Sequence, residues 1–316
     1  MKVTSVGAAM LLLIVGNLIA VLSDALIKSV GNEVPVFQFV FYRQLSAVMM
    51  LLPVYLLTKQ APLMEGFKWH AVRAHVWLTG AIFMVFAISS MPLATANAIF
   101  YAAPLIMLPL AAIFFGEKLS AQSIAAAVMG FAGVLVIIRP DQIDWAALSA
   151  LVVAVTLAIN NLLIRKLPKN QSVPHTLLMT NLAGMPVSLL LVFIEGEAWD
   201  WSSFPVAAGS SLFIMIYAAT CVLAYRSIDS NKIASAEYSG LIGAVIVGLI
   251  WFGEVPDIFM AIGTVMIVVP LIWLSKRERR KQKQAQDAKL AEEPHHRAPA
   301  ASVSEQPSVH RSAIVF

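Results

Sequence analysis

One stretch of this sequence occurs twice, and the repeat constrains the fold more than any other feature. Residues 101–117 read YAAPLIMLPLAAIFFGE, and residues 238–254 read YSGLIGAVIVGLIWFGE. Each copy begins with a tyrosine, continues with mostly apolar residues and closes with Phe-Gly-Glu. The second copy lies 137 residues after the first, because Tyr101 is matched by Tyr238 and Glu117 by Glu254. Each copy is long enough to cross most of a bilayer and predicts a membrane helix that ends at a carboxylate.

The composition excludes a soluble fold. Hydrophobic residues make up 59% of the 316 residues and charged residues only 13%, whereas about a quarter of the residues in a soluble domain are charged. The mean hydropathy is +0.79. The sequence therefore predicts an all-α integral membrane protein.

The net charge of +4 does not predict a nucleic-acid partner, because the basic residues lie in short loops and in the run 276–281, next to an apolar span. This placement is typical of orientation signals. The one cysteine, Cys221, excludes an intrachain disulfide. No Cys/His cluster indicates a metal, so no metal or cofactor is expected.

Ten apolar runs near the length of a membrane span can be counted. Pro92 provides the break between the third and fourth runs, since proline disfavours helix at the residue before it. The predicted helices are 5–28, 36–57, 75–91, 93–115, 121–138, 144–164, 174–194, 204–226, 231–252 and 257–275.

The same offset relates other parts of the chain. Residues 24–28, DALIK, fall on residues 161–165, NLLIR, which keeps a polar residue, an apolar triplet and a terminal cation in register. Five spans therefore map onto five spans. Because five is odd, the second copy enters the membrane from the opposite side, so the sequence predicts an inverted-topology repeat. We expect a first repeat over 1–140 and a second over 141–275.

The loops predict the orientation. Most basic loop residues lie on the side of the two termini, which places both termini in the cytoplasm, Glu117 at the inner face and Glu254 at the outer face. Residues 276–316 are basic and then polar, without an apolar period. This composition predicts a disordered cytoplasmic tail.

Arg43 in FVFYRQLSA, early in the second span, and the closing pattern FFGEKLSAQSIAAAVMGFAGVLVIIRP carry a family resemblance. Within ten duplicated spans, they resemble the EamA family of the drug/metabolite transporter superfamily. The second repeat departs from the first, with Leu241 in place of Pro104 and Pro270 in place of Gly133. The resemblance implies an inner-membrane carrier, often an exporter of amino acids or related metabolites, with alternating access around a central cavity. It implies no particular substrate.

Asp24 and Arg43 are ionisable groups at similar depths in adjacent spans. Three interpretations are open. The side chains pair with each other, or Arg43 binds a substrate carboxylate or Asp24 an amine, or the Arg43 side chain extends to the outer surface of the membrane.

Glu237 is the sharpest candidate for binding or coupling. It directly precedes Tyr238, and its counterpart in the first repeat is Phe100, so the fold itself does not require a charge there. It is either a cavity carboxylate that binds a cation or takes up a coupling proton, or a group at the interface paired with Lys232.

Further polar residues lie within the spans. Asn97 and Tyr101 share a helix face, four residues apart, and Asn160, Asn161 and Tyr217 lie in the second repeat. Such residues either join helices by hydrogen bonds or line a polar path.

The residues at the helix ends have structural explanations. We expect Glu117 and Glu254 to mark the ends of their helices, with Ser120 and Asp257 capping the helices that follow. Gly130 and Gly133 predict close helix contact, either within one chain or between the two chains of a homodimer.

The predicted function is secondary transport of a small polar metabolite, an amino acid or an amine derivative, outward across the cytoplasmic membrane. The alternative on the same fold is import of a larger nucleoside-like or vitamin metabolite. A lipid-acting enzyme is disfavoured because the six histidines lie in loops, in the tail or near helix ends, and a channel is disfavoured because no charge rings occur.

Overall fold

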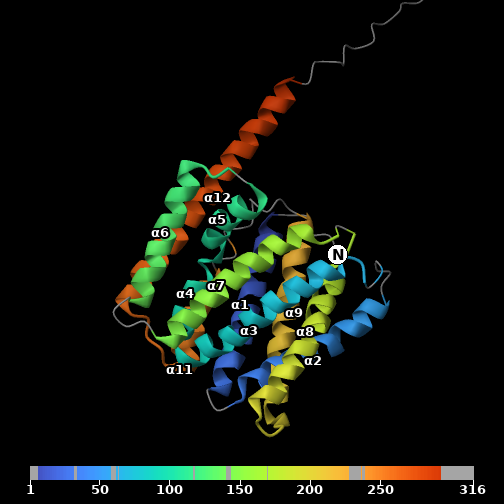
Figure 1. Cartoon of the computed structure of the whole chain (residues 1–316). Helices are drawn as coiled ribbons and strands as arrows, with labels where there is room; N and C mark the ends of the chain where they lie inside the picture. The colour runs from blue at the N-terminus through green and yellow to red at the C-terminus, as the bar shows by residue number, and fades with distance from the viewer. Residues whose placement is uncertain are drawn as a thin grey trace, which may run out of the picture.

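The computed structural model describes residues 6–31, 34–57, 62, 64–116, 118–139, 144–168, 170–227, 236 and 239–292. This part of the chain is helical and contains no strand (Figure 1). The α-helices are α1 (Val6–Val30), α2 (Val36–Leu57), α3 (Phe67–Ser90), α4 (Leu93–Phe100), α5 (Ala103–Phe115), α6 (Ala121–Ile138), α7 (Trp145–Leu163), α8 (Val173–Glu195), α9 (Phe204–Ser227), α11 (Ser239–Phe252) and α12 (Ile258–Glu292), with short 3₁₀ turns at Ile164–Lys166 and Trp201–Ser203.

The chain is a multi-pass membrane protein. Nine segments of the described residues are long and apolar enough to cross a bilayer, and α4 and α5 together form one of them, Leu93–Phe115. Helix α11 has 14 residues, which span about 21 Å. It lies within the ninth predicted span, 231–252. The large apolar side chains exposed on the outside of the bundle are those that lipid would cover.

Helix boundaries repeat at the predicted offset of 137 residues. Helices α2 and α8 begin at Val36 and Val173, and α3 and α9 begin at Phe67 and Phe204. Helices α5 and α11 both end before a glycine, Gly116 or Gly253, with a φ of 64°. A left-handed glycine is a common end of a helix, so the glycine of Phe-Gly-Glu stops each copy at the same point.

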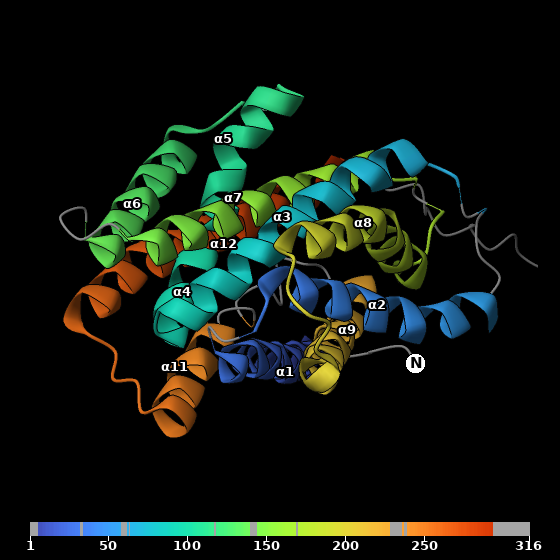
Figure 2. The same cartoon turned by 60° about the horizontal axis from the view of Figure 1, so that its bottom comes forward.

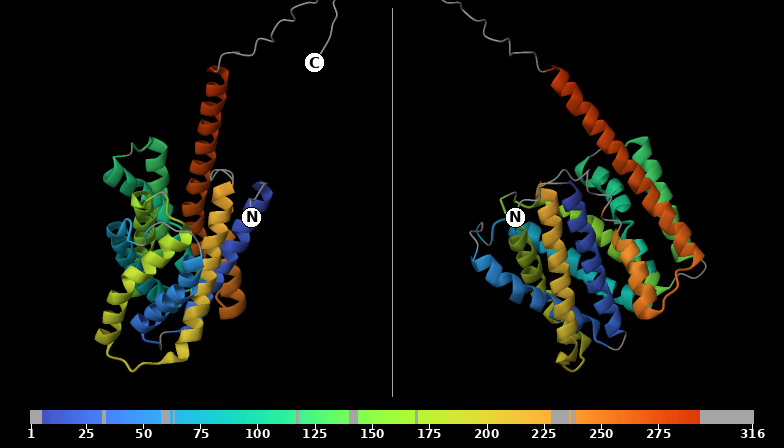
Figure 3. Two further views of the ribbon diagram at one scale, coloured as in Figure 1. Left: turned by 90° about the vertical axis from the view of Figure 1, so that its right-hand side faces the viewer. Right: turned by 180° about the vertical axis from the view of Figure 1, so that it is seen from behind.

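The packing of the helices repeats as well. Helix α1 packs along α9 and its counterpart α7 packs along α3, while α1 contacts α11 and α7 contacts α5. Two pairs of counterparts pack on each other, α2 with α8 and α6 with α12. Figure 2 shows α3 and α7 side by side, and the rear view in Figure 3 shows α1 beside α9 and α12 beside α6. This exchange of partners between halves is that of an inverted repeat.

Small residues bring these helices together. A Cβ on Gly133 would lie 2.7 Å from the carbonyl oxygen of Gly263 in α12, and a Cβ on Gly80 would lie 2.5 Å from the Thr156 hydroxyl in α7. The glycine face of α6 is therefore covered by α12 within the chain, which is the first of the two alternatives stated above. Gly130 packs against Leu105 of α5.

Three expectations about the helices are wrong. Helix α3 begins at Phe67 rather than at 75, because the early polar residues His70 and Arg73 find partners inside the protein, in Gln171 and Thr180. The span 93–115 is not continuous. It breaks at Tyr101–Ala102, before Pro104 in the first turn of α5.

The third concerns the tail. Disorder does not begin at residue 276, because α12 continues to Glu292 and projects beyond the bundle (Figure 3). Residues 276–292 contain no glycine or proline and are rich in Lys, Arg, Gln and Ala, which are good helix formers. The rest of the tail, 293–316, lies outside the described residues.

The glycine that ends α11 gives a test of the repeat signal. Neither Gly253 nor Gly7 has an atom within 4 Å of an added Cβ, but only Gly253 has a positive φ. Gly253→Ala should destabilise the protein by about 1–2 kcal/mol through backbone strain alone. Gly7→Ala, inside α1, should stabilise it by up to about 1 kcal/mol. Thermal unfolding in detergent measures both, and an equal effect of the two substitutions would contradict this explanation.

Candidate functional site

A cavity of about 250 Å³ lies between the two repeats. Its walls come from α1, α2 and α3 of the first repeat and from their counterparts α7, α8 and α9 of the second. Membrane carriers built from inverted repeats bind their substrates at such an interface. The polar side chains that line it are Asp24, Arg43, Trp77, Thr156, Asn160, Asn181, Ser211 and Tyr217.

The cavity lies across the middle of the bundle. We call the end at which α1 finishes the Lys28 side and the opposite end the Lys166 side. The lining residues Leu51, Asn160 and Leu177 lie within two turns of helix ends on the Lys166 side, and Asp24 and Met84 lie within two turns of helix ends on the Lys28 side.

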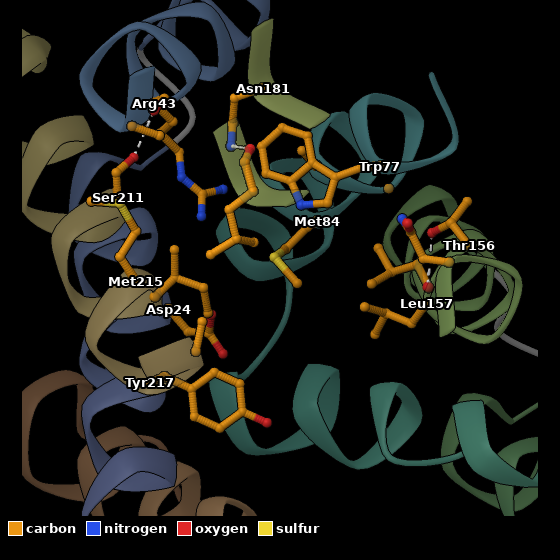
Figure 4. Close-up of a pocket in the computed structure, with 18 of the residues that line it drawn as sticks. Asp24, Arg43, Trp77, Met84, Thr156, Leu157, Asn181, Ser211, Met215 and Tyr217 are labelled. Carbon is orange, nitrogen blue, oxygen red and sulfur yellow. Dashed lines mark hydrogen bonds between the residues drawn. The ribbon is translucent and has the colours of Figure 1, made fainter. Parts of the chain in front are cut away.

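Arg43 and Asp24 provide the two opposite charges in the cavity. Figure 4 shows both side chains directed into the same space, opposite Trp77 and Met84. Arg43 is 5% exposed, and its Nε and Nη1 atoms have no hydrogen-bond partner in the described part of the chain. Asp24 accepts a hydrogen bond of 3.2 Å from Asn97 Nδ2.

Arg43 and Asp24, both described, form no ion pair. The ion pairs within the described ranges are Lys28–Glu254 and Arg139–Asp257. The first of the three interpretations, direct pairing, is therefore wrong for this structure. The reason is that Asp24 has a partner on α4, whereas the backbone oxygen of Arg43 is tied to Ser211 on α9 by a bond of 2.8 Å.

Two asparagine side chains leave further hydrogen-bonding capacity in the cavity wall. The Oδ1 atoms of Asn160 and Asn181 are buried and have no partner among the described residues. Nδ2 of Asn181 donates to Leu177 O at 2.8 Å. Buried polar atoms are normally satisfied, so these oxygens are acceptors available to a molecule or to water in the cavity. The remaining wall is apolar, as in most small-molecule sites.

Some of the predicted site residues line the cavity and others do not. Asp24, Arg43, Asn160 and Tyr217 line the cavity. Asn161 is exposed and does not line it. Asn97 contacts the cavity only through Asp24, and the hydroxyl of Tyr101 faces Gly240 in α11.

The strongest predicted candidate cannot be placed. Glu237, Tyr238 and Glu117 lie outside the described residues. Glu254 lies on the Lys28 side, where one carboxylate oxygen is 2.7 Å from Lys28 Nζ and the other accepts a 2.7 Å hydrogen bond from Leu93 N. The two predicted helix caps are confirmed, since Ser120 and Asp257 accept bonds from Ser123 N and Met260 N.

Several lining residues were not predicted, and the repeat contains the signal for some of them. Gly80 is the counterpart of Tyr217, and Trp77 is the counterpart of Ile214, at the offset of 137. All four line the cavity. Mapping Tyr217 back onto the first repeat would have identified this face of α3.

The histidines lie apart from this cavity. His70 and His175, in the first turns of α3 and α8, stack with ring centroids 5.9 Å apart, and His70 Nε2 lies 2.8 Å from Gln171 Oε1. Within the described residues, no group of three or more His, Cys, Asp or Glu side chains is arranged to hold a metal ion.

Comparison with known proteins agrees with this architecture. The model of the EamA-like transporter family matches residues 7–139, the first repeat. The first repeat of this chain therefore resembles the EamA-like transporter family. Its structure also resembles a solved protein chain with a TM-score of 0.53 and 19% identity, over 84% of this chain and 96% of that one. This likeness shows the fold alone.

Curated relatives of this chain carry different cargoes. A pseudopaline exporter of Pseudomonas aeruginosa is 26% identical over 84% of this chain and 97% of its own length. An S-adenosylmethionine uptake transporter of Rickettsia prowazekii is 22% identical over 82% and 89%, and a riboflavin transporter of Rhizobium johnstonii is 25% identical over 71% and 75%. The chain is thus a membrane transporter, not an enzyme.

The cavity can be tested with neighbouring alanines of α9. Ala218 lines the cavity, whereas Ala219 is exposed and does not. Ala218→Phe should leave only a small fraction of the parent flux, because the ring takes up space in a cavity of about 250 Å³. Ala219→Phe should transport normally. Efflux from proteoliposomes loaded with a labelled metabolite mixture measures both, and normal flux in Ala218→Phe would show that the pathway lies elsewhere.

Proposed function

We propose that this transporter carries a small zwitterionic metabolite, an amino acid or an amine derivative, out of the cell across the cytoplasmic membrane. The observation that carries the proposal is the pair of opposite charges in the cavity, Asp24 and Arg43, which form no ion pair with each other and leave Nε and Nη1 of Arg43 without a hydrogen-bond partner in the described part of the chain. A buried charge is costly without a partner. A cargo carboxylate at Arg43 and a cargo ammonium at Asp24 would provide both partners.

The chemistry of the side chains supports these roles. The planar guanidinium suits bidentate binding of a carboxylate. Asp24 keeps acceptor capacity beyond its one described bond, from Asn97. The acceptor oxygens of Asn160 and Asn181 would add partners for an ammonium. The cargo named for the Rickettsia relative, S-adenosylmethionine, combines an amino-acid group with a nucleoside, so this relative supports an amino-acid group in the cargo and also the larger nucleoside-like alternative.

The volume of the cavity favours a small cargo over a larger nucleoside-like or vitamin metabolite. About 250 Å³ is below the range of roughly 300–1,000 Å³ typical of pockets for drug-sized ligands. Import of a larger metabolite is the alternative that the riboflavin-transporting relative supports.

Export is the direction named for the pseudopaline-exporting relative. The basic loops predict that the Lys166 side and both termini lie in the cytoplasm. A cytoplasmic cargo would then enter the cavity from the Lys166 side. Transport would then proceed by rocking of the two repeats, 1–140 and 141–275, around the cavity.

The charges can be tested by competition and substitution. With the parent protein in proteoliposomes, an amino-acid methyl ester, which lacks the carboxylate, and an N-acetyl amino acid, which lacks the ammonium, should both compete poorly. In Arg43→Met, the methyl ester should compete about as well as the zwitterion, because the partner of the carboxylate is gone. In Asp24→Asn, the N-acetyl compound should compete about as well as the zwitterion, because the partner of the ammonium is gone. Each substitution should weaken zwitterion binding roughly 10- to 100-fold, as expected for loss of a bond to a charged group.

Adjacent asparagines of α7 provide a matched control. Asn160→Ala should weaken transport, whereas Asn161→Ala, on the exposed face, should not. Equal competition by zwitterion, ester and N-acetyl compound in the parent would contradict the zwitterion proposal.

We propose in addition that Glu237 takes up the coupling proton. Its support is the sequence alone, since a charge at this position has no counterpart in the first repeat. Glu237→Gln should abolish the dependence of transport on a pH gradient, because glutamine cannot be deprotonated. Unchanged pH-dependent transport in this variant, measured in proteoliposomes with and without the gradient, would rule out the role.

A further inference from the structure

A connected set of polar contacts closes the Lys28 side of the cavity. It begins with Lys28, in the last turn of α1. Lys28 Nζ lies 2.7 Å from Glu254 Oε1 and donates hydrogen bonds to two carbonyl oxygens at the end of α3, Met91 O at 2.7 Å and Ile88 O at 3.2 Å. One side chain therefore joins α1, the α3–α4 turn and the end of the second repeat's α11.

Glu254 completes this junction from the opposite repeat. Its Oε2 accepts a hydrogen bond of 2.7 Å from Leu93 N, the first residue of α4. A carboxylate at a helix N-terminus also interacts favourably with the helix dipole. The Lys28 and Glu254 side chains are only 12% and 16% exposed. Ion pairs shielded from water in this way are stronger than exposed ones.

A second contact between α1 and α4 lies one turn deeper. Asp24 precedes Lys28 by four residues and so lies on the same face of α1. Asn97 follows Leu93 by four residues on α4. Its Nδ2 donates to Asp24 Oδ2 at 3.2 Å and to Leu93 O at 3.1 Å. The two helices are thus joined at the Lys28–Glu254 pair and again at the Asp24–Asn97 bond, and Asp24 also lines the cavity.

We infer that Lys28, Glu254, Asn97 and Asp24 form a latch that holds the Lys28 side closed and that Asn97 is the positioning residue linking the latch to the cavity. A cation bound at the remaining acceptor positions of Asp24 neutralises the carboxylate and so weakens its hydrogen bond from the amide of Asn97. Occupancy of the cavity then weakens the deeper contact and favours opening of the Lys28 side. This last step rests on the proposed binding of a cargo ammonium by Asp24, whereas the closure itself does not.

The latch is tested by the accessibility of one cysteine, without any substrate. Cys221→Ser removes the only cysteine, and Met84→Cys then introduces one in the cavity wall. This pair of substitutions is the background for every latch variant. Membrane vesicles of both orientations are treated with a membrane-impermeant maleimide. A separate Ser29→Cys variant, at an exposed position beside Lys28, shows which vesicles present the Lys28 side to the reagent.

With the latch intact, the thiol introduced by Met84→Cys should react slowly from the Lys28 side. Lys28→Met and Glu254→Gln should each raise this rate roughly ten-fold, the factor expected for loss of one charge-assisted hydrogen bond. Lys28→Arg, which keeps a cation and its donors, should leave the rate close to that of the intact latch. The control is Arg139→Met, which breaks the exposed Arg139–Asp257 pair between α6 and α12 and should leave the rate unchanged.

The role of Asn97 is tested by a double-mutant cycle. Asn97→Leu and Asp24→Leu should each raise the labelling rate. The double variant should label no faster than the faster single variant, since both substitutions remove the same hydrogen bond. Additive effects would overturn the link between the latch and the cavity.

Other outcomes overturn the latch itself. Unchanged labelling in both Lys28→Met and Glu254→Gln would do so, as would an equal increase in Arg139→Met. A variant that labels equally fast from both sides has lost its fold, and the closure is then judged on Glu254→Gln against Lys28→Arg. Because no substrate enters the assay, the latch can fail while the zwitterion proposal holds, and the reverse.

Discussion

Polar groups in a bilayer must find their partners within the protein, and this constraint shapes the structure wherever a helix starts or stops. At the start of α2, the carboxylate of Glu195 accepts hydrogen bonds of 3.0 Å from both Phe37 N and Gln38 N. At the turn between α3 and α4, Lys28 and Glu254 satisfy two carbonyls and one amide. In both places the carboxylate that accepts from the backbone amides comes from the other repeat. The same requirement makes Arg43 conspicuous, because its buried guanidinium atoms have no such partner in the described structure.

Much of the fold could be predicted because hydrophobic length and the repeat are properties of the sequence alone. The offset of 137 residues predicts the pairing of α2 with α8 and of α6 with α12 as counterparts, and their first residues agree with it. The late start predicted for α3 has a physical cause, since Lys68, His70 and Arg73 have the composition of an interface. The repeat could have given the correct start. The eighth span was predicted to begin at residue 204, and subtracting the offset of 137 residues gives residue 67, where α3 begins.

The site could be predicted only in part, because depth can be estimated from a sequence but the direction of a side chain cannot. Asn160 and Asn161 are adjacent, yet about 100° of rotation separates them on a helix, and only Asn160 reaches the cavity. The repeat does not predict which face of α7 lines the cavity. Asn161 is the counterpart of Asp24, but only Asp24 lines the cavity. Their similar depth likewise made Asp24 and Arg43 plausible partners. In the structure, however, Asp24 accepts a hydrogen bond from the amide of Asn97 on a third helix.

Glu254 and the amide of Leu93 are 161 residues apart in the chain, which has a consequence for the order in which the protein is made. During synthesis the first residue of α4 enters the membrane well before the ribosome reaches Glu254. At about 5–20 residues per second, the interval is roughly 8 to 30 s. Through this time the first repeat lacks the group that completes the turn before α4 and neutralises Lys28. The first half of this transporter is therefore an incomplete folding unit, and its maturation depends on the last loop of the second half.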